Sequence, residues 1–164
     1  MLALLAALTT GCTQLAQSAS TDVKRGQVSL RPLLDSDALA IPGAGPDDVT
    51  AVLGEPTSSE VAEKSDDEPD GTVTTMRYDG LEVVVHEIDK PKRSFISDLV
   101  ISNRAYVPSL PVTVGISRRD VEQVLGEPPE TEDGDVAYDL SDDGDLCIVT
   151  YDGNKVAQVA FRFS

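Results

Sequence analysis

The sequence predicts an α+β fold in which a short helix followed by a three-stranded antiparallel meander occurs twice, with both helices packed on one sheet face. Three observations predict this fold. First, residues 48–56 (DVTAVLGEP) return as residues 120–128 (DVEQVLGEP), an offset of 72 positions. Second, apolar residues inside each block recur at helical spacing. Third, the runs that follow each block alternate with period two and are separated by Asp-Gly pairs, which mark hairpin turns.

Each repeated block contains one predicted helix. In the second block Ser117 is a suitable N-cap, and Val121, Val124 and Leu125 lie on one helical face. Gly126 ends this helix. The first block has the same pattern at Val49, Val52, Leu53 and Gly54. Both helices are short and would be marginal alone in water, so packing on the sheet must hold them.

Three strands are predicted after each helix. They cover residues 73–79, 81–88 and 95–102 in the first copy, and residues 136–140, 146–151 and 155–163 in the second. Aligning Leu81 with Leu146 places Leu81, Val83 and Val85, together with Leu146 and Ile148, on the helix-facing side. Each copy is small for an independent core, so we expect the two sheets to join or to pack together.

The chain is therefore expected to divide into four parts. Residues 1–11 form a signal peptide, residues 12–35 form a lipidated N-terminus with a flexible tether, residues 36–103 form the first module, and residues 108–164 form the second. Within the first module, the acidic stretch 58–71 is predicted to be a mobile loop.

The N-terminus indicates export. An uncharged apolar run ends in Thr10 and Gly11 just before Cys12, and it is too short to span a bilayer. This stretch resembles the lipobox of bacterial lipoproteins, which implies lipid attached to Cys12 and anchoring of the chain in a membrane of the cell envelope. Thr13, rather than Asp, follows the cysteine, which favours the periplasmic face of the outer membrane in a Gram-negative cell. The alternative is a cytosolic protein in which Gly-Cys occurs by chance.

The formal net charge is −16, with 29 acidic and 13 basic residues. This balance argues against nucleic acid as a partner, because phosphate binding requires clustered lysine and arginine. It also argues against a polybasic contact with anionic lipids. Solubility is the simpler explanation of the acidic surface, and a cationic partner is the alternative.

No combination of residues indicates catalysis, and we expect neither a catalytic residue, a metal nor a cofactor. Residues 139–145 partly match the spacing of a calcium loop, but Thr150 stands where that loop needs glutamate. His86 is the sole histidine and lies in a strand-like run. If Cys12 carries lipid, Cys147 is a free thiol, and a buried structural role is expected for it. A small hydrolase that uses Cys147 or the acidic loops stays as a minor alternative.

The candidate binding site is the sheet face opposite the helices. Under the predicted alternation this face carries Cys147 together with Val84, His86, Val149, Tyr151, Gln158 and Arg162. A partly apolar exposed face is suited to docking a protein partner. The alternative is that the two repeats meet through this face.

The pattern of a glycine, a short helix, Val-x-x-Val-Leu-Gly-x-Pro and an aromatic-bearing meander resembles the SmpA/OmlA lipoprotein family. The resemblance covers residues 36–103 and 108–163. It implies a fold like each half of the β-lactamase inhibitory protein, which is a tandem duplication, although family members usually carry one module with two helices. It also implies a non-enzymatic envelope lipoprotein that binds another protein, in outer-membrane assembly or maintenance. The alternative implied by the tandem likeness is an inhibitor or immunity-type protein that binds a secreted hydrolase.

Overall fold

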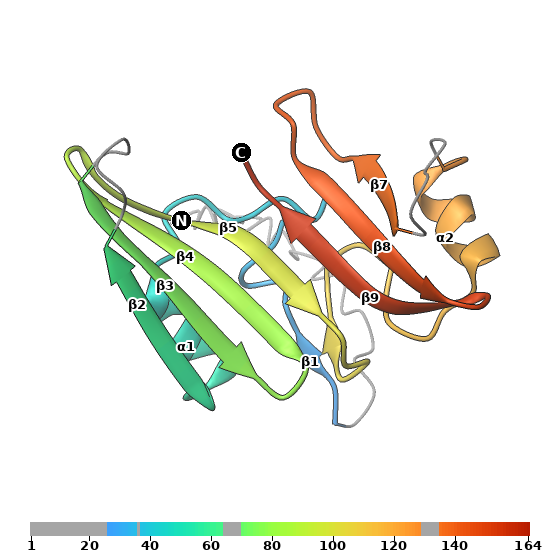
Figure 1. The fold of residues 1–164 in the computed structure, drawn as a ribbon, viewed down its shortest axis with the longest axis horizontal. Helices are drawn as coiled ribbons and strands as arrows, with labels where there is room; N and C mark the ends of the chain where they lie inside the picture. Colours follow the sequence, from blue (N-terminus) through green and yellow to red (C-terminus); the bar gives the residue numbers. More distant parts are fainter. Residues whose placement is uncertain (1–25, 36, 64–69, 129–134) are drawn as a thin grey trace, which may run out of the picture.

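A single antiparallel sheet of seven strands forms the body of the protein, with helices on one side of it (Figure 1). The computed structural model describes residues 26–35, 37–63, 70–128 and 135–164. The strand order is β2-β3-β4-β5-β9-β8-β7, and a separate parallel pair joins β1 to β6. The α+β class predicted from the sequence is confirmed.

Along the chain, a short strand precedes a helix and four strands, and a second short strand then precedes a helix and three strands. Their bounds are β1 Val28–Ser29, α1 Pro46–Leu53, β2 Ser58–Glu63, β3 Gly71–Tyr78, β4 Leu81–Asp89, β5 Lys92–Ile101, β6 Tyr106–Val107, α2 Arg118–Leu125, β7 Asp135–Asp139, β8 Leu146–Asp152 and β9 Lys155–Arg162. We call α1 with β2–β5 the first half and α2 with β7–β9 the second half.

The two helices begin and end in the same way. The Ser117 Oγ accepts from the Asp120 N–H at 3.2 Å, and the Asp120 carboxylate accepts in return from the Ser117 N–H. At α1 the Asp48 carboxylate accepts from the Gly45 N–H at 2.9 Å. Beyond the last turn, Gly54 has φ 79° and Gly126 has φ 90°, values that favour glycine. The predicted helices are therefore confirmed, because their start and stop signals are local.

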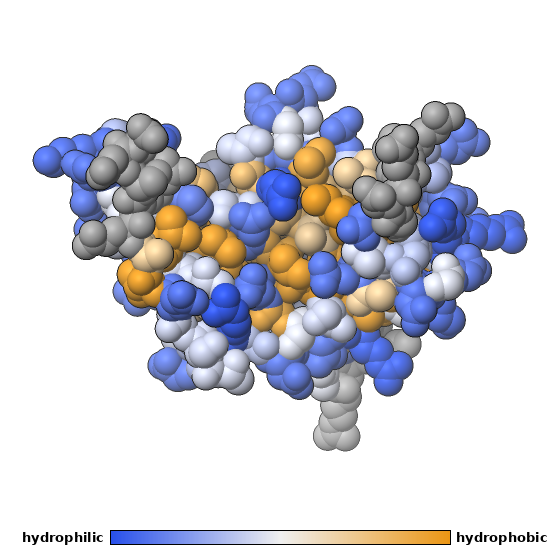
Figure 2. Space-filling model, in the orientation of Figure 1, coloured by the Kyte–Doolittle hydropathy of each residue, from blue (hydrophilic) through white to orange (hydrophobic). Residues whose placement is uncertain are grey.

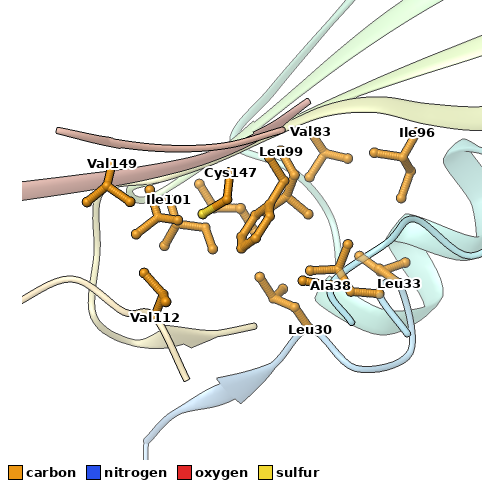
Figure 3. Packing of buried hydrophobic residues seen from close by; sticks show 14 of the residues in the cluster. Leu30, Leu33, Ala38, Val83, Ile96, Leu99, Ile101, Val112, Cys147 and Val149 are labelled. Atoms are coloured by element: carbon orange, nitrogen blue, oxygen red, sulfur yellow. The ribbon is translucent and has the colours of Figure 1, made fainter. Parts of the chain in front are cut away.

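The core lies between the sheet and the helices and runs without a break through both halves (Figure 3). Val83 pairs with Leu99, Leu99 with Phe161, and Phe161 with Cys147, across four adjacent strands. All four side chains are fully buried. The halves thus share one hydrophobic core. Either half alone would be small for a core of its own.

The two halves join through the edges of strands. Residues Asp98 to Ile101 of β5 pair antiparallel with Arg162 to Val159 of β9. The expected joining of the sheets is confirmed, and the alternative in which the repeats meet through the open sheet face is wrong. Edge pairing satisfies backbone hydrogen bonds that two separate sheets would leave exposed at this seam.

The predicted loop 58–71 is wrong in its first part. Ser58–Glu63 forms β2, which pairs with β3 from Ser58↔Arg77 to Glu63↔Thr72. The stretch is polar, but as an edge strand it needs little burial, and pairing with β3 overrides its weak propensity for strand. Residues 64–69 of this loop lie outside the described residues.

The predicted tether also ends earlier than expected. Residues 12–35 were expected to be flexible, yet Leu30, Leu33 and Leu34 are at most 1 % exposed. Figure 3 shows Leu30 and Leu33 facing the sheet side chains at the seam. These leucines follow no period of helix or strand, because they fill the space beneath the seam from an irregular segment. The hydrophobic core therefore includes residues N-terminal to 36.

The predicted register of β8 is shifted by one residue. Tyr78 pairs with Leu81 across a two-residue turn, whereas its counterpart Tyr138 pairs with Cys147 across a longer turn. Cys147, not Leu146, therefore occupies the place of Leu81. Since side chains alternate between faces, a slip of one residue exchanges the two faces of the strand.

A β-bulge occurs at the same place in each half. The register shifts between Val84 and Val85 in the β4·β5 pair, and between Thr150 and Tyr151 in the β8·β9 pair. The extra residues are Ser97 on β5 and Ala157 on β9. A bulge of this kind bends the strand that carries it, which is the later strand in each half.

Candidate functional site

The sheet face opposite the helices is a partly apolar surface, and we call it the open face. Val100 pairs with Ala160, Ala160 with Ile148, and Ile148 with Ala137, so one apolar row crosses β5, β9, β8 and β7. All four residues are half-buried. Figure 2 shows hydrophobic surface gathered over the middle of the sheet and hydrophilic surface around it.

Charged side chains border the apolar row. The Arg77 guanidinium contacts the carboxylates of Glu82 at 2.8 Å and Glu60 at 3.4 Å, and the two glutamates hold the pKa of Arg77 above its ordinary value. Arg162 contacts Asp98 at 3.2 Å and so bridges the seam. Such exposed ion pairs add little stability, but they fix the side chains that surround the apolar row.

Four of the predicted face residues lie where they were expected. Val84 and His86 are on the open face of β4, and Gln158 and Arg162 are on the open face of β9. The His86 ring stacks on Phe95, with ring centres 5.2 Å apart and planes 19° from parallel. Val84, His86 and Gln158 are half-buried, and Arg162 is exposed.

The other predicted face residues lie on the opposite side of the sheet. Val149 and Cys147 are fully buried against the helices. Tyr151 pairs with the buried Val156, and the Arg118 guanidinium of α2 lies 4.3 Å from its ring centre. All three predictions fail for one reason, the one-residue slip of β8 described above.

Because of the same one-residue shift, the sequence prediction missed residues that form the middle of the open face. Ile148 was predicted to face the helices, yet it lies in the centre of the apolar row. Its partner Ala160 and the seam residue Val100 were not singled out. The apolar alternation of β5 and β9 indicates these two residues. It assigns them to the open face only when the pairing of β5 with β9 is known.

The groups that could carry chemistry are used structurally. Burial raises the pKa of the Cys147 thiol to about 12, which leaves it protonated and unreactive at neutral pH. In residues 139–145, which partly match the spacing of a calcium loop, the Asp145 carboxylate accepts from the Ser141 hydroxyl at 2.8 Å and from the Ser164 N–H at 2.9 Å. Within the described ranges, no three histidine, cysteine or acidic side chains gather in a way that could hold a metal ion.

A second feature of the surface is a groove of about 730 Å³ where β5 and β9 separate. Its apolar walls come from the segment before α1, from β5 and from the C-terminal end of the chain. The apolar residues that line it are Leu39, Ala40, Ile41, Pro42, Phe95, Ile96 and Phe163. Arg93, Asp35 and Asp145 are the charged residues of its lining. Sequence patterns gave no sign of this groove, because its walls are distant in the chain.

No protein-family model and no curated protein sequence matches the chain. Among solved structures, the chain is similar to the uncharacterized protein YfeY from Escherichia coli. The two are 12 % identical with a TM-score of 0.46, and the match covers 84 % of this chain and 99 % of YfeY.

Proposed function

We propose that this protein is a non-catalytic envelope lipoprotein that binds another protein through the open face, in outer-membrane assembly or maintenance. The observation that carries the proposal is the apolar row Val100, Ala160, Ile148 and Ala137, which both halves build together. A partly exposed apolar row within a border of fixed charges is the composition of a docking surface.

The proposal includes two tandem modules of the kind found in the β-lactamase inhibitory protein. Three matched features support a duplication. Each helix has an aspartate at its third position that caps the residue before the helix, namely Asp48 and Asp120. Each helix ends at a glycine with positive φ. Each half has its bulge at the equivalent pair of strands.

Lipid on Cys12 is the second part of the proposal. Cys12 and the predicted signal peptide, residues 1–11, lie outside the described residues. In the part of the chain that the structure describes, no helix is long and apolar enough to cross a membrane. Mass spectrometry of the membrane fraction should find diacylglyceryl on Cys12, and Cys12→Ser should release the protein. A mature N-terminus elsewhere would contradict this part alone.

Photo-crosslinking in intact envelopes tests the docking surface. A photoreactive amino acid at Ile148, in the apolar row, should give one discrete crosslinked product. The matched control places it at Gln123, an exposed residue of α2, and should give none. Equal products at both positions, or no product at Ile148, would contradict docking through the open face.

The identity of the crosslinked protein separates the two functions that the resemblance implies. A component that assembles or maintains the outer membrane supports the proposal. A secreted hydrolase that loses activity when bound supports the inhibitor or immunity-type alternative. Ile148→Lys should lower recovery of either partner at least tenfold, and Gln123→Lys should leave it unchanged, because burying a lysine at an interface is costly.

A further inference from the structure

Among the strands that the structure describes, part of β5 has a neighbour on one side only. β4 pairs with β5 along its whole length, from Lys92 to Ile101, whereas β9 pairs with β5 only from Asp98 to Ile101. One further bond, from the Phe163 N–H to the Ser97 carbonyl at 2.8 Å, marks the point where the strands separate (Figure 1). In the described part of the chain, no strand lies beside residues 92–96 of β5 on that side. This stretch is an open strand edge inside the molecule.

The groove of about 730 Å³ lies along this open edge. Its volume is in the range of sites that enclose a ligand. Leu39, Ile41 and Pro42 line it from the segment before α1, which we call its wall, Phe95 and Ile96 line it from β5, and Phe163 lines it from the C-terminal end of the chain. The Ser94 hydroxyl donates to the Gly43 carbonyl at 2.8 Å and ties the wall to the strand. An apolar wall beside free backbone groups is the arrangement used to bind an added strand.

The charged residues of the groove differ in what they already bind. The Asp35 carboxylate accepts from the N–H groups of Asp37 and Leu39. The Asp145 carboxylate accepts from the Ser141 hydroxyl of its own turn and from the Ser164 N–H. The Arg93 guanidinium lies 6.0 Å from the Phe95 ring centre and makes no ion pair with any residue of the described part.

The turn that leads into this strand concentrates positive charge. Lys90, Lys92 and Arg93 are three cations within four consecutive residues of a chain whose net charge is −16. All three are exposed. The positive charge that is left to attract a ligand therefore lies on the β5 side of the groove.

We propose that this groove binds an extended segment of a partner polypeptide, in which apolar and acidic residues alternate, as an added strand beside residues 92–96. Ser94 and Ile96 point to the helix side of the sheet, and Arg93 and Phe95 point to the open face. A strand added here would direct its apolar side chains to the wall at Leu39–Pro42. Its acidic side chains would then lie next to Arg93.

The open backbone edge favours a peptide over a lipid chain. An alkyl chain would fill the apolar groove, but it would cover the N–H and C=O groups of β5 without satisfying them, which is unfavourable. A peptide backbone supplies both kinds of partner. This binding mode goes beyond docking on the open face, since it uses the edge of one strand rather than the face of the sheet.

Titration followed by amide NMR tests the proposal with a synthetic probe, a capped hexapeptide of alternating valine and glutamate. The probe should bind saturably, shift the amides of Ser94 and Ile96, and slow their exchange with solvent. Arg93→Gln should weaken binding at least fivefold, whereas Arg104→Gln, a matched change of an exposed arginine elsewhere, should not. The open-face variant Ile148→Lys should bind the probe normally, which separates this site from the proposed docking surface.

Three matched ligands complete the experiment. A valine–lysine hexapeptide should bind more weakly, and an N-methylated form of the probe, which lacks backbone donors, should not bind at the groove. Equal binding by the N-methylated form or by the lysine form would overturn the proposal. Sodium laurate should leave the β5 amides unshifted. Laurate that shifts these amides while the probe does not would identify a site for amphiphiles and overturn strand addition.

Discussion

The two halves of this protein use the same helix-on-sheet packing but differ in how the helix is fixed to the strands. Val49 of α1 and Val121 of α2 are each fully buried, and so are Val83 and Val149, which occupy equivalent strand positions in the same core. In the first half the Tyr78 hydroxyl donates to the Gly54 carbonyl at the end of α1, at 3.3 Å. In the second half the counterpart Tyr138 makes no such bond to any residue that the structure describes.

The tyrosine hydroxyl groups of the second half are arranged differently. The Tyr138 and Tyr151 hydroxyl groups are neighbours beneath α2, and neither has a hydrogen-bond partner of good geometry among the described residues. Burial is the main cause that raises the pKa of Tyr151, and the neighbouring Tyr138 hydroxyl adds to it. Arg118 at the start of α2 covers the Tyr151 ring. The apolar contacts are thus shared by both halves, while the polar contacts around each helix are particular to one half.

The largest loss of stability is expected from a substitution at the seam that both halves share. Phe161→Ala removes a fully buried ring that pairs with Leu99 and Cys147, and should lower the free energy of unfolding by about 4 kcal/mol. Urea denaturation measures the loss, and amide exchange in β4 and β8 should rise together. Phe163→Ala, at the half-buried end of the chain, is the control and should cost less. Loss of protection in β8 alone would contradict a common core.

Matched valine truncations compare the helices directly. Val49→Ala and Val121→Ala each delete two buried methyl groups, so each should lower the free energy of unfolding by about 2 kcal/mol, measured in urea. Val124→Ala is the control, because Val124 is 39 % exposed and its loss should be near zero. Unequal losses at the two buried valines would show that the halves do not pack their helices equivalently.

The helix caps should give a smaller effect that depends on pH. Ser117→Ala should lower stability by about 1 kcal/mol at pH 7. Hydrogen bonds from Ser117 hold the pKa of Asp120 below its ordinary value of 3.8, so the carboxylate stabilises the fold above about pH 4. That contribution is lost as the pH falls through the lower pKa of the folded state. The difference between Ser117→Ala and wild type should therefore shrink at about pH 3 in urea titrations.

Gly45→Ser provides the matched cap variant in the first half. Gly45 has φ −107°, which a serine adopts without strain, and an added Cβ would lie 3.4 Å from the Ser94 Oγ. We expect a gain of a few tenths of a kcal/mol, since serine is a better cap than glycine.

An equal effect of Ser117→Ala at pH 3 and pH 7 would contradict the role given to Asp120.

The smallest effects belong to the tyrosine hydroxyl groups. Tyr78→Phe removes an exposed hydrogen bond to Gly54 and should cost about 0.5 kcal/mol in thermal or urea unfolding. Tyr138→Phe removes a buried hydroxyl that has no hydrogen-bond partner of good geometry among the described residues, and it should be neutral or slightly stabilising. A clear loss with Tyr138→Phe would show that the hydroxyl pair with Tyr151 stabilises the second half.

Local features of the sequence predicted local structure well. Both helices were found because a capping residue such as Ser117 and a terminating glycine such as Gly126 act within one turn of the chain. The turn at Gly80 was found for the same reason, since Tyr78 and Leu81 pair directly across it.

Features that depend on distant parts of the chain were not predictable in this way. The length of the turn before Leu146 decides which face Val149 occupies, and aligning the repeats at Leu146 gave the wrong answer. β2 forms only because β3 offers an edge, and Leu30 is buried only because the seam leaves space beneath it. The open face was therefore predicted correctly as a surface but with several wrong members. The groove beside β5 was not predicted at all.

Cys147 occupies the position in the second half that Leu81 occupies in the first, so the shared core contains a thiol. The reactivity of this thiol can report when the second half opens. Only the thiolate reacts with alkylating reagents, and burial raises the pKa of Cys147 to about 12. In a Cys12→Ser chain, the rate at which iodoacetamide modifies Cys147 at pH 8 would follow the fraction of molecules whose second half is open. A partner that binds the open face and keeps the second half closed would slow this reaction without contacting the sulfur. The alkylation rate of Cys147, on the other side of the sheet, would therefore report binding.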